Sequence, residues 1–217
     1  MRSLAIEKLK QNLSLAPLQR EVLVGLLLGG GCLETQNKGR TYRLKIEQCK
    51  AHQAYVEHLY RLFEGWVLTP PRIKQVVSRG RASENISFQT VSHSALRFYA
   101  HQFYRDGRKQ VPKLIHRWLS PRALSYWFMD DGSIKSKESK GVILNTQAFQ
   151  LADVERLIQS LQANFGLQVW IRNQREGCQI YISGNSYEKF NELVAPYVLP
   201  EMQYKLPRPR RTQLPKE

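Results

Sequence analysis

The chain has 217 residues, and its 33 Lys and Arg against 18 Asp and Glu give it a formal net charge of +15. Its 42% hydrophobic residues can form a core, which argues against disorder over most of the chain. The longest apolar run, residues 22–28, is far shorter than the roughly 20 residues of a membrane span, so no membrane partner is expected. The charge favours a polyanion such as nucleic acid, although a basic protein that is merely soluble would also carry it.

The first predicted element is an apolar helix that follows Pro17 and ends at Gly29, Gly30 and Gly31. Strand, helix and hairpin patterns come after it: a strand over 40–48, a helix over 52–63, strands over 72–79 and 84–90, and a helix over 94–104. A linker is expected near residues 106–113.

The same order of elements then repeats. A second apolar helix, with Ser120 and Pro121 at its start, ends at Gly132, 101 residues after Gly31. It precedes a strand over 141–147, a helix over 151–165, strands over 167–173 and 178–183, and a helix over 187–194. The chain therefore reads as two similar α+β halves in tandem.

The predicted strands alternate between apolar and polar residues, which indicates sheets with one apolar and one polar face. Any antiparallel sheet with one solvated face shows this pattern. Here, however, the polar positions are rich in Arg, Lys, Gln and Asn, which contact bases and phosphates. We expect a nucleic-acid surface that includes Arg43, Lys45, Arg72, Lys74, Asn85, Gln89, Gln168, Arg172 and Gln179.

The string W-F-M-D-D-G at residues 127–132 places two acids at the end of an apolar helix. A helix C-terminus disfavours negative charge, and a bound divalent cation would reverse that preference. A solvated Asp-Asp-Gly turn is the simpler interpretation of the string alone. No histidine pattern or CxxC pair indicates zinc, and the odd count of three cysteines argues against a disulfide scaffold.

Together, the repeat, the strand faces and the motif resemble the LAGLIDADG homing endonucleases of the monomeric two-motif type. The resemblance runs from about Leu18 to Pro207, and its most specific strings are Y-W-F-M-D-D-G (126–132), L-N-T-Q (144–147), V-L-T-P-P (67–71) and Y-K-L-P (204–207). It implies an α+β fold of two tandem pseudo-symmetric αββαββα halves, with two antiparallel sheets that form a saddle over DNA. The expected divisions are an N-terminal half (1–106), a linker (107–120), a C-terminal half (121–204) and a basic tail (205–217).

The resemblance also implies roles for particular residues. Asp131 matches the catalytic, metal-binding acid of the second motif, with Mg²⁺ as the expected ion, and Asp130 matches a structural neighbour. Lys109 and Lys205 match basic residues near the centre that orient water, stabilise charge or simply contact phosphate. Asn145 and Gln147, on the strand after the second motif, are expected to contact bases or support the acid.

The first motif departs from the family, because Gly30 stands where the partner acid of Asp131 is expected. Glycine has no side chain with which to bind a metal. Three explanations of Gly30 compete. It is an inactivating substitution in an otherwise working enzyme, or the chain is a natural family member that binds DNA but cuts weakly or nicks. In the third, the chain is a maturase that binds intron RNA. We expect a monomer with a long, non-palindromic duplex DNA target and impaired cleavage, in an organelle (mitochondrion or chloroplast) or a bacterial cytoplasm, since the cysteines indicate a reducing compartment.

Overall fold

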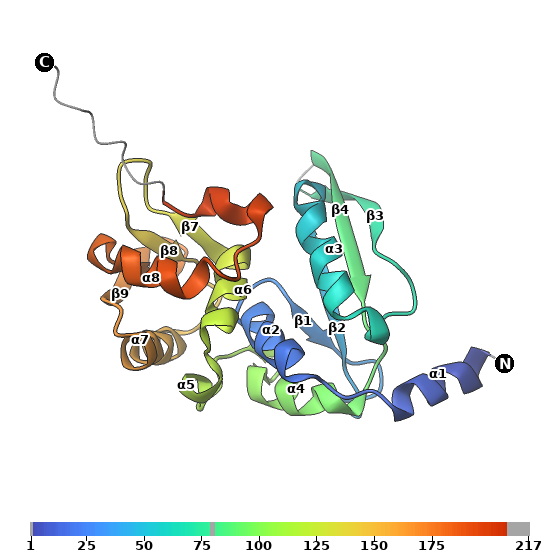
Figure 1. Ribbon diagram of the computed structural model, residues 1–217. Coiled ribbons are helices and arrows are strands. Elements are labelled where there is room, and N and C mark those ends of the chain that lie inside the picture. The colour runs from blue at the N-terminus through green and yellow to red at the C-terminus, as the bar shows by residue number, and fades with distance from the viewer. Residues whose placement is uncertain (1, 79–80, 208–217) are drawn as a thin grey trace, which may run out of the picture.

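The structure, a computed structural model, describes residues 2–78 and 81–207. It confirms an α+β fold with two four-stranded antiparallel sheets in the same order, β1-β2-β4-β3 and β7-β8-β10-β9. Figure 1 shows one sheet on each side of the central helices α2 and α6. The tandem repeat predicted from the order of elements is therefore present in three dimensions.

Each half contributes a helix, two strands, a helix, two strands and a further helix. The first comprises α2 (Pro17–Leu28), β1 (Cys32–Glu34), β2 (Arg43–Cys49), α3 (Gln53–Leu62), β3 (Arg72–Ser78), β4 (Arg81–Gln89) and α4 (Arg97–Phe103). The second comprises α6 (Pro121–Asp131), β7 (Gly132–Ile134), β8 (Val142–Leu144), α7 (Leu151–Phe165), β9 (Val169–Gln174), β10 (Gly177–Ile182) and α8 (Tyr187–Val194). Outside this repeat lie α1 (Arg2–Gln11), β5 (Tyr104–Arg105), β6 (Arg108–Lys109), α5 (Ile115–Trp118) and the 3-10 helix η5 (Pro200–Lys205).

Several expected elements differ in extent. The strand predicted over 141–147 is too long, because β8 ends at Leu144 and the chain then turns toward Asp131. The sequence pattern did not predict strands β1 and β7, because three residues are too few to show an alternation of apolar and polar side chains. The expected helix over 94–104 begins as a 3-10 turn and becomes α-helical at Arg97. Residue 79, expected in a strand, lies outside the described residues, as does the tail after Pro207.

The central helices begin as their sequences predict. Pro17 and Pro121 occupy the first turns, and the Ser120 hydroxyl accepts a hydrogen bond of 3.2 Å from the amide of Ala123. Both helices end at the expected glycines, but Gly29 (φ −99°) and Gly132 (φ −82°) do not adopt the left-handed conformation of a glycine cap. The glycines are needed here for close packing rather than for an unusual backbone conformation.

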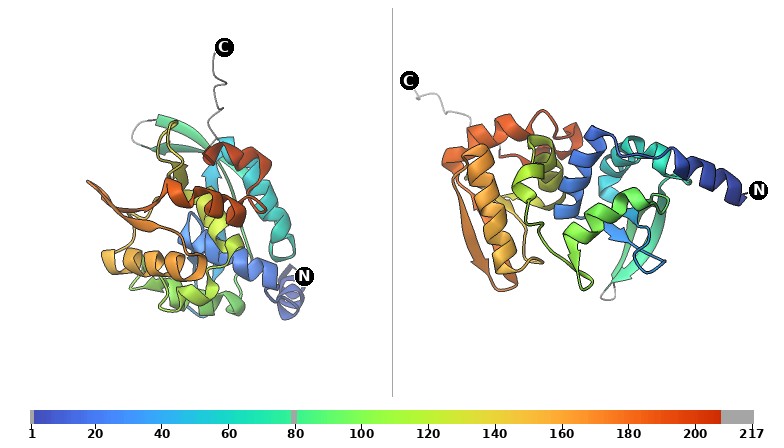
Figure 2. Two further views of the ribbon diagram at one scale, coloured as in Figure 1. Left: turned by 60° about the vertical axis from the view of Figure 1, so that its left-hand side comes forward. Right: turned by 90° about the horizontal axis from the view of Figure 1, so that it is seen from below.

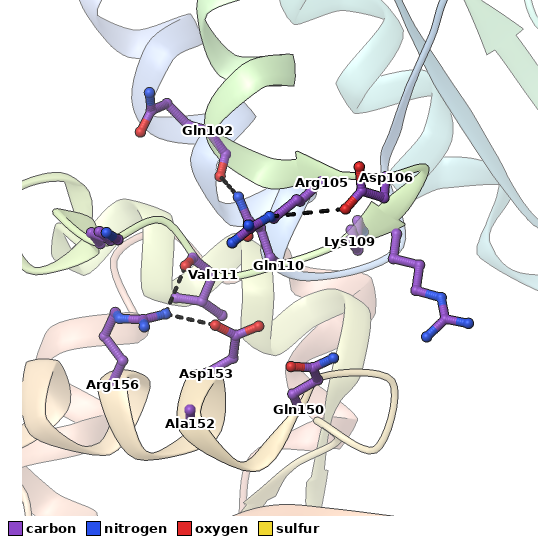
Figure 3. Close-up of a pocket in the computed structure, with 12 residues that line it drawn as sticks. Gln102, Arg105, Asp106, Lys109, Gln110, Val111, Gln150, Ala152, Asp153 and Arg156 are labelled. Carbon is purple, nitrogen blue, oxygen red and sulfur yellow. Dashed lines mark hydrogen bonds and ion pairs between the residues drawn. The ribbon is translucent and has the colours of Figure 1, made fainter.

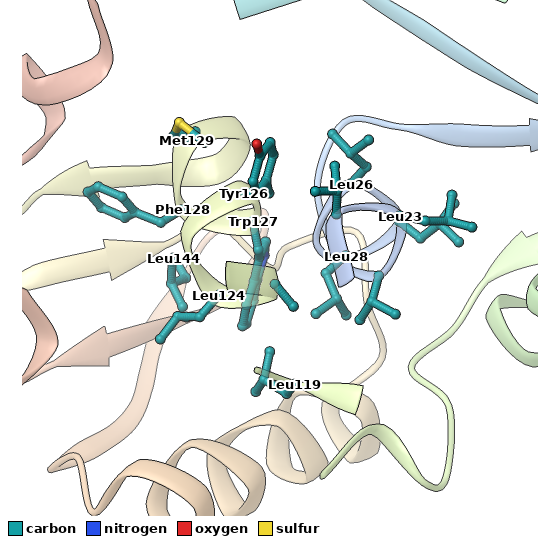
Figure 4. Close-up of a cluster of buried hydrophobic side chains, with 14 of the residues drawn as sticks. Leu23, Leu26, Leu28, Leu119, Leu124, Tyr126, Trp127, Phe128, Met129 and Leu144 are labelled. Atoms are coloured by element: carbon teal, nitrogen blue, oxygen red, sulfur yellow. The ribbon is translucent and has the colours of Figure 1, made fainter. Parts of the chain in front are cut away.

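Helices α2 and α6 pack against each other along one seam of the core. Leu26 of α2 faces Tyr126 and Trp127 of α6 (Figure 4). A Cβ atom added at Gly25 would lie only 2.4 Å from the carbonyl oxygen of Ala123, and one at Gly29 would lie 2.6 Å from Asp130 Cβ. Glycine at these two positions therefore permits the helices to approach.

The hairpins β3–β4 and β9–β10 project to the same side of the molecule, as Figure 2 shows, whereas α3 lies toward the opposite side. None of the described helices is long and apolar enough to cross a membrane. All three cysteines carry free thiols. The arrangement leaves the ends of α2 and α6 between two sheets whose hairpins point the same way.

Candidate functional site

The C-terminal ends of α2 and α6 are joined by the side chain of Asp130. Its Oδ2 accepts a hydrogen bond of 2.9 Å from the backbone amide of Gly30, and its Oδ1 accepts one of 3.1 Å from Nε2 of Gln48. The carboxyl group of the second motif therefore satisfies an amide at the end of the first. Asp130 thus links the ends of the two helices.

Burial raises the pKa of Asp130 to about 7, and the neighbouring charge of Asp131 contributes in the same direction. The Gly30 amide, the buried hydroxyl of Tyr55 and the charge of Lys205 oppose this shift. Both oxygens of this carboxyl group accept hydrogen bonds, from Gly30 and Gln48, so Asp130 is poorly placed to bind a cation there.

Two lysines occupy equivalent positions at the ends of the two helices. Lys109 Nζ donates to the carbonyl oxygen of Gly29, at 2.6 Å. Lys205 Nζ donates to the carbonyl oxygen of Asp130, at 3.0 Å, and to that of Met129. Burial lowers the pKa of each lysine, whereas the carboxylates of Asp130 and Asp131 raise it. Each lysine thereby satisfies carbonyl groups that a helix end leaves without partners.

Asp131 lies at the end of α6, where burial raises the pKa of its carboxyl group. The charges of the nearby Lys109 and Lys205 oppose that rise. Its backbone carbonyl accepts hydrogen bonds of 2.9 Å from both the amide and Nδ2 of Asn145. The main chain of Asp131 is therefore held by the loop after β8, while its carboxylate lies in a field of two cations. The structure brings together the expected Asp131, Lys109, Lys205 and Asn145.

Gly30 leaves the equivalent position of the first half without a carboxylate. A Cβ atom there would lie 3.1 Å from Gln48 Nε2 and 3.7 Å from the carboxyl group of Asp130. Among the described residues no three His, Cys, Asp or Glu side chains form a metal-binding group. Magnesium is often held by one or two carboxylates together with substrate phosphates and water, so the residues present fit an ion at Asp131 but not one held at Gly30.

The polar side chains predicted to contact nucleic acid lie on the sheets or directly beside them. In the first half Lys45 pairs with Gln89, and Asn85 pairs with Lys74, across neighbouring strands. Arg72, Lys74 and Gln89 are exposed, as are Gln168 and Arg172 in the second half. The predicted residues fall in the following places: Arg43 and Lys45 on β2, Arg72 and Lys74 on β3, Asn85 and Gln89 on β4, Arg172 on β9, Gln179 on β10, Gln168 just before β9, and Asn145 and Gln147 after β8.

The polar positions of the first sheet also carry acids that pair with the predicted contact residues. Glu34 Oε2 accepts a hydrogen bond of 2.8 Å from Arg43, and Glu47 lies 3.2 Å from Lys45 Nζ. Glu47 also accepts a hydrogen bond of 3.0 Å from Asn85. Three of the predicted contact residues are therefore paired within the protein. Arg43 and Asn85 pair with acids on neighbouring strands, whereas Lys45 and Glu47 lie two residues apart on β2.

In the second half the predicted amides form a connected network. Asn145 Oδ1 accepts hydrogen bonds from Nε2 of Gln179, at 2.7 Å, and of Gln147, at 3.5 Å. Since Asn145 also donates to the carbonyl of Asp131, the network ties strand β10 to the end of α6. These three residues are brought together at the acid, and two of them lie outside the strand in which they were expected.

A basic hollow of about 630 Å³ adjoins Lys109 between the β5–β6 linker and α7 (Figure 3). Arg156 Nη1 donates to the carbonyl of Val111, at 2.8 Å, and to Asp153, at 2.6 Å. Other basic side chains that line the hollow are Arg105, Arg108 and Lys113. The positive surface therefore continues from the helix ends along the linker.

The sequence did not indicate two residues that surround Asp130. Gln48 lies 82 residues away in the chain, and Tyr55 is a buried core residue of α3. Neither belongs to a motif, so only a spatial comparison of the two halves could have found them.

The chain matches, over residues 20–190, the sequence model described as the LAGLIDADG DNA endonuclease family. It is 34% identical over 203 residues to the probable intron-encoded endonuclease 1 of Wickerhamomyces canadensis, covering 91% of this chain and 87% of that protein. It is 29% identical to the cytochrome b mRNA maturase bI2 of Debaryomyces hansenii, over 88% of this chain and 75% of that protein. The structure of the homing endonuclease I-WcaI bound to its DNA recognition sequence matches with a TM-score of 0.88 and 31% identity, covering 93% of this chain and 91% of that one.

Proposed function

This chain belongs to the LAGLIDADG DNA endonuclease family, and we propose that it recognises a specific duplex DNA site and hydrolyses phosphodiester bonds there with the help of Mg²⁺. Cleavage is impaired, because the first of the two motif acids is replaced by Gly30. The proposal rests on one observation: the two helix ends meet between two polar sheet faces, with Asp131 and the lysines Lys109 and Lys205 around them.

The polar strand residues would contact bases and phosphates in the major groove, which admits a β-ribbon. Because one chain supplies two unlike halves, a monomer suits a long, non-palindromic target. The excess of cations supplies sequence-independent attraction to the DNA backbone. The similarity to I-WcaI, described with its DNA recognition sequence, supports this mode.

Cleavage would use the few groups at the helix ends. Asp131 would hold Mg²⁺ together with phosphate oxygens and water. A bound divalent ion lowers the pKa of water and stabilises negative charge on phosphate oxygens. Lys109 and Lys205, held in place by the carbonyl groups of the helix ends, would orient water or stabilise the charge that develops at the scissile phosphate.

The missing acid makes the centre asymmetric. Asp130 does not replace it, since its carboxyl group is engaged with Gly30 and Gln48 and has a pKa near 7. One acid supports hydrolysis of one strand better than of two, so nicking or slow cutting is the expected activity. The free cysteines suit a reducing compartment, either organellar or bacterial.

Splicing of intron RNA is the second candidate function. Its support is the glycine at position 30, which removes a group that cleavage needs but RNA binding does not, together with the similarity to a protein named as an mRNA maturase. A splicing cofactor would use the basic surface without the acid pair.

A cleavage assay with Mg²⁺ on a randomised duplex library tests the proposal, with this chain and Gly30→Asp side by side and Gly30→Ser as the control for the added side chain. We expect double-strand cuts from Gly30→Asp, and nicks or slow cuts from this chain. Full double-strand cutting by this chain would refute the proposal that Gly30 impairs cleavage. Absence of cutting by both, with tight binding to structured intron RNA, would replace the endonuclease function with the splicing function.

A further inference from the structure

Helices α4 and α5 form an edge of the molecule that the proposed DNA interface does not use. Figures 1 and 2 place both helices along one edge, whereas the hairpins β3–β4 and β9–β10 project to a different side. The Phe98 ring of α4 lies 5.6 Å from the Trp118 ring of α5, so the two helices share one surface. We refer to Arg97, Phe98, Leu114, Arg117 and Trp118 as the α4–α5 patch.

The patch exposes a large aromatic side chain that is held firmly from beneath. Phe98 is 54% exposed although it belongs to a well-packed helix. Its ring is in edge contact with Tyr99, at 5.4 Å, as well as with Trp118. Trp118 in turn lies 6.4 Å from the fully buried Phe103. The exposed ring is therefore packed on one side against other aromatic rings.

The segment that carries this ring is basic. Residues 97–118 contain one acid, Asp106, and six Lys and Arg residues, of which Arg105, Arg108 and Lys109 belong to the β5–β6 hairpin. Asp106 lies beside Arg105 in the turn of the β5–β6 hairpin. Arg97, Arg117 and Lys113 are exposed, and His101 is exposed one turn after Arg97 on the same side of α4. A partner of this surface must be negatively charged and must offer flat groups that can lie on an aromatic ring.

Beyond the proposed cleavage of duplex DNA, we propose that the α4–α5 patch binds single-stranded RNA. Unpaired bases stack on exposed aromatic rings while neighbouring arginines neutralise the phosphates. Duplex DNA keeps its bases stacked inside the helix and offers no free face to Phe98. Folded RNA presents unpaired bases in loops and bulges, and these match a single exposed ring on a basic helix surface.

The test measures the affinity of the full chain for a fluorescein-labelled single-stranded RNA of mixed sequence, about 20 nucleotides long, by fluorescence anisotropy in about 150 mM salt. The variants are Phe98→Ala and Arg117→Ala, with Leu151→Ala and Arg61→Ala as matched exposed controls on α7 and α3. We expect each patch variant to lower RNA affinity by about tenfold and each control to change it less than about twofold. The variant Phe98→Tyr keeps an aromatic face and should restore binding.

The same proteins are titrated with a mixed-sequence DNA duplex. This titration distinguishes an error in the assignment of the RNA surface from an error in the proposed DNA interface. The patch variants should bind the duplex like the unaltered chain, whereas Lys45→Ala with Arg172→Ala should weaken duplex binding more than RNA binding. An unchanged RNA affinity in Phe98→Ala, or an equal loss for RNA and duplex, would overturn the inference. Tighter binding of single-stranded DNA than of RNA would overturn the assignment to RNA. Circular dichroism confirms that each variant is folded.

Discussion

The carboxyl group of Asp130 accepts a hydrogen bond from the backbone amide of Gly30, 2.9 Å away and 100 residues earlier in the chain. Asp130, which precedes the proposed catalytic Asp131, is therefore hydrogen-bonded to Gly30, the position at which the first motif lacks its acid. This contact makes the end of α2 dependent on the protonation and position of a side chain from α6.

The first prediction concerns the pH dependence of stability. Because the pKa of Asp130 is raised in the folded state to about 7 from 3.8, protonation favours folding. Its contribution is fully present below about pH 4 and is lost as the pH rises through about 7. The loss is on the order of 4 kcal/mol, and Asp130→Asn should remove it.

Urea unfolding at a series of pH values measures this. The free energy of unfolding of the unaltered chain should fall between about pH 4 and pH 7 relative to that of Asp130→Asn. The exposed Asp106→Asn is the control and should follow the unaltered chain. Parallel curves for the unaltered chain and Asp130→Asn would contradict the assignment.

The second prediction concerns helix packing. A methyl group at Gly25 would lie 2.4 Å from the carbonyl oxygen of Ala123, so Gly25→Ala must push α2 and α6 apart. We expect a loss of about 3 kcal/mol or more in the free energy of unfolding. Gly65→Ala is the control, since a Cβ atom there meets no other atom within 4 Å, and its effect should be below about 1 kcal/mol. Equal thermal unfolding of the two variants would refute the close approach.

The third prediction separates binding from chemistry at Asp131. Asp131→Asn keeps the size of the side chain but removes the charge proposed to hold Mg²⁺. Any nicking should fall at least about 100-fold, while DNA affinity should change by less than about twofold. Nicking assays and anisotropy on the same duplex measure the two effects. A collapse of affinity would make Asp131 a structural residue.

The fourth prediction concerns the acid that pairs with the predicted contact residues. Glu34 lies 2.8 Å from Arg43 and 3.8 Å from Lys45, so Glu34→Gln would free Arg43 for phosphate, whereas Lys45 would keep Glu47 at 3.2 Å. We expect tighter non-specific binding to duplex DNA and a steeper salt dependence, by about one unit of slope. Glu155→Gln on α7 makes the same charge change away from the strands and should leave the slope nearly unchanged. A slope that changes equally in both variants would show a general charge effect.

Much of the fold followed from local patterns. Helix starts at Pro17 and Ser120, strand alternation and the repeated order of elements depend on residues close together in the chain, and these predicted two similar halves. Three-residue strands such as β1 were missed, because their position depends on pairing with β2 rather than on their own residues.

The sequence by itself determined the net charge, the tandem repeat and the absence of an acid at position 30, because each is a property of residue identity and order. Only the tertiary structure decided that Asp130 and Gln48 meet beside Gly30. It also decided that Lys109 and Lys205 reach the ends of α2 and α6, and that Glu34 pairs with Arg43. Such contacts join residues from different elements. They exist only once α2 and α6 pack, and the space between those helices sets which side chains face each other.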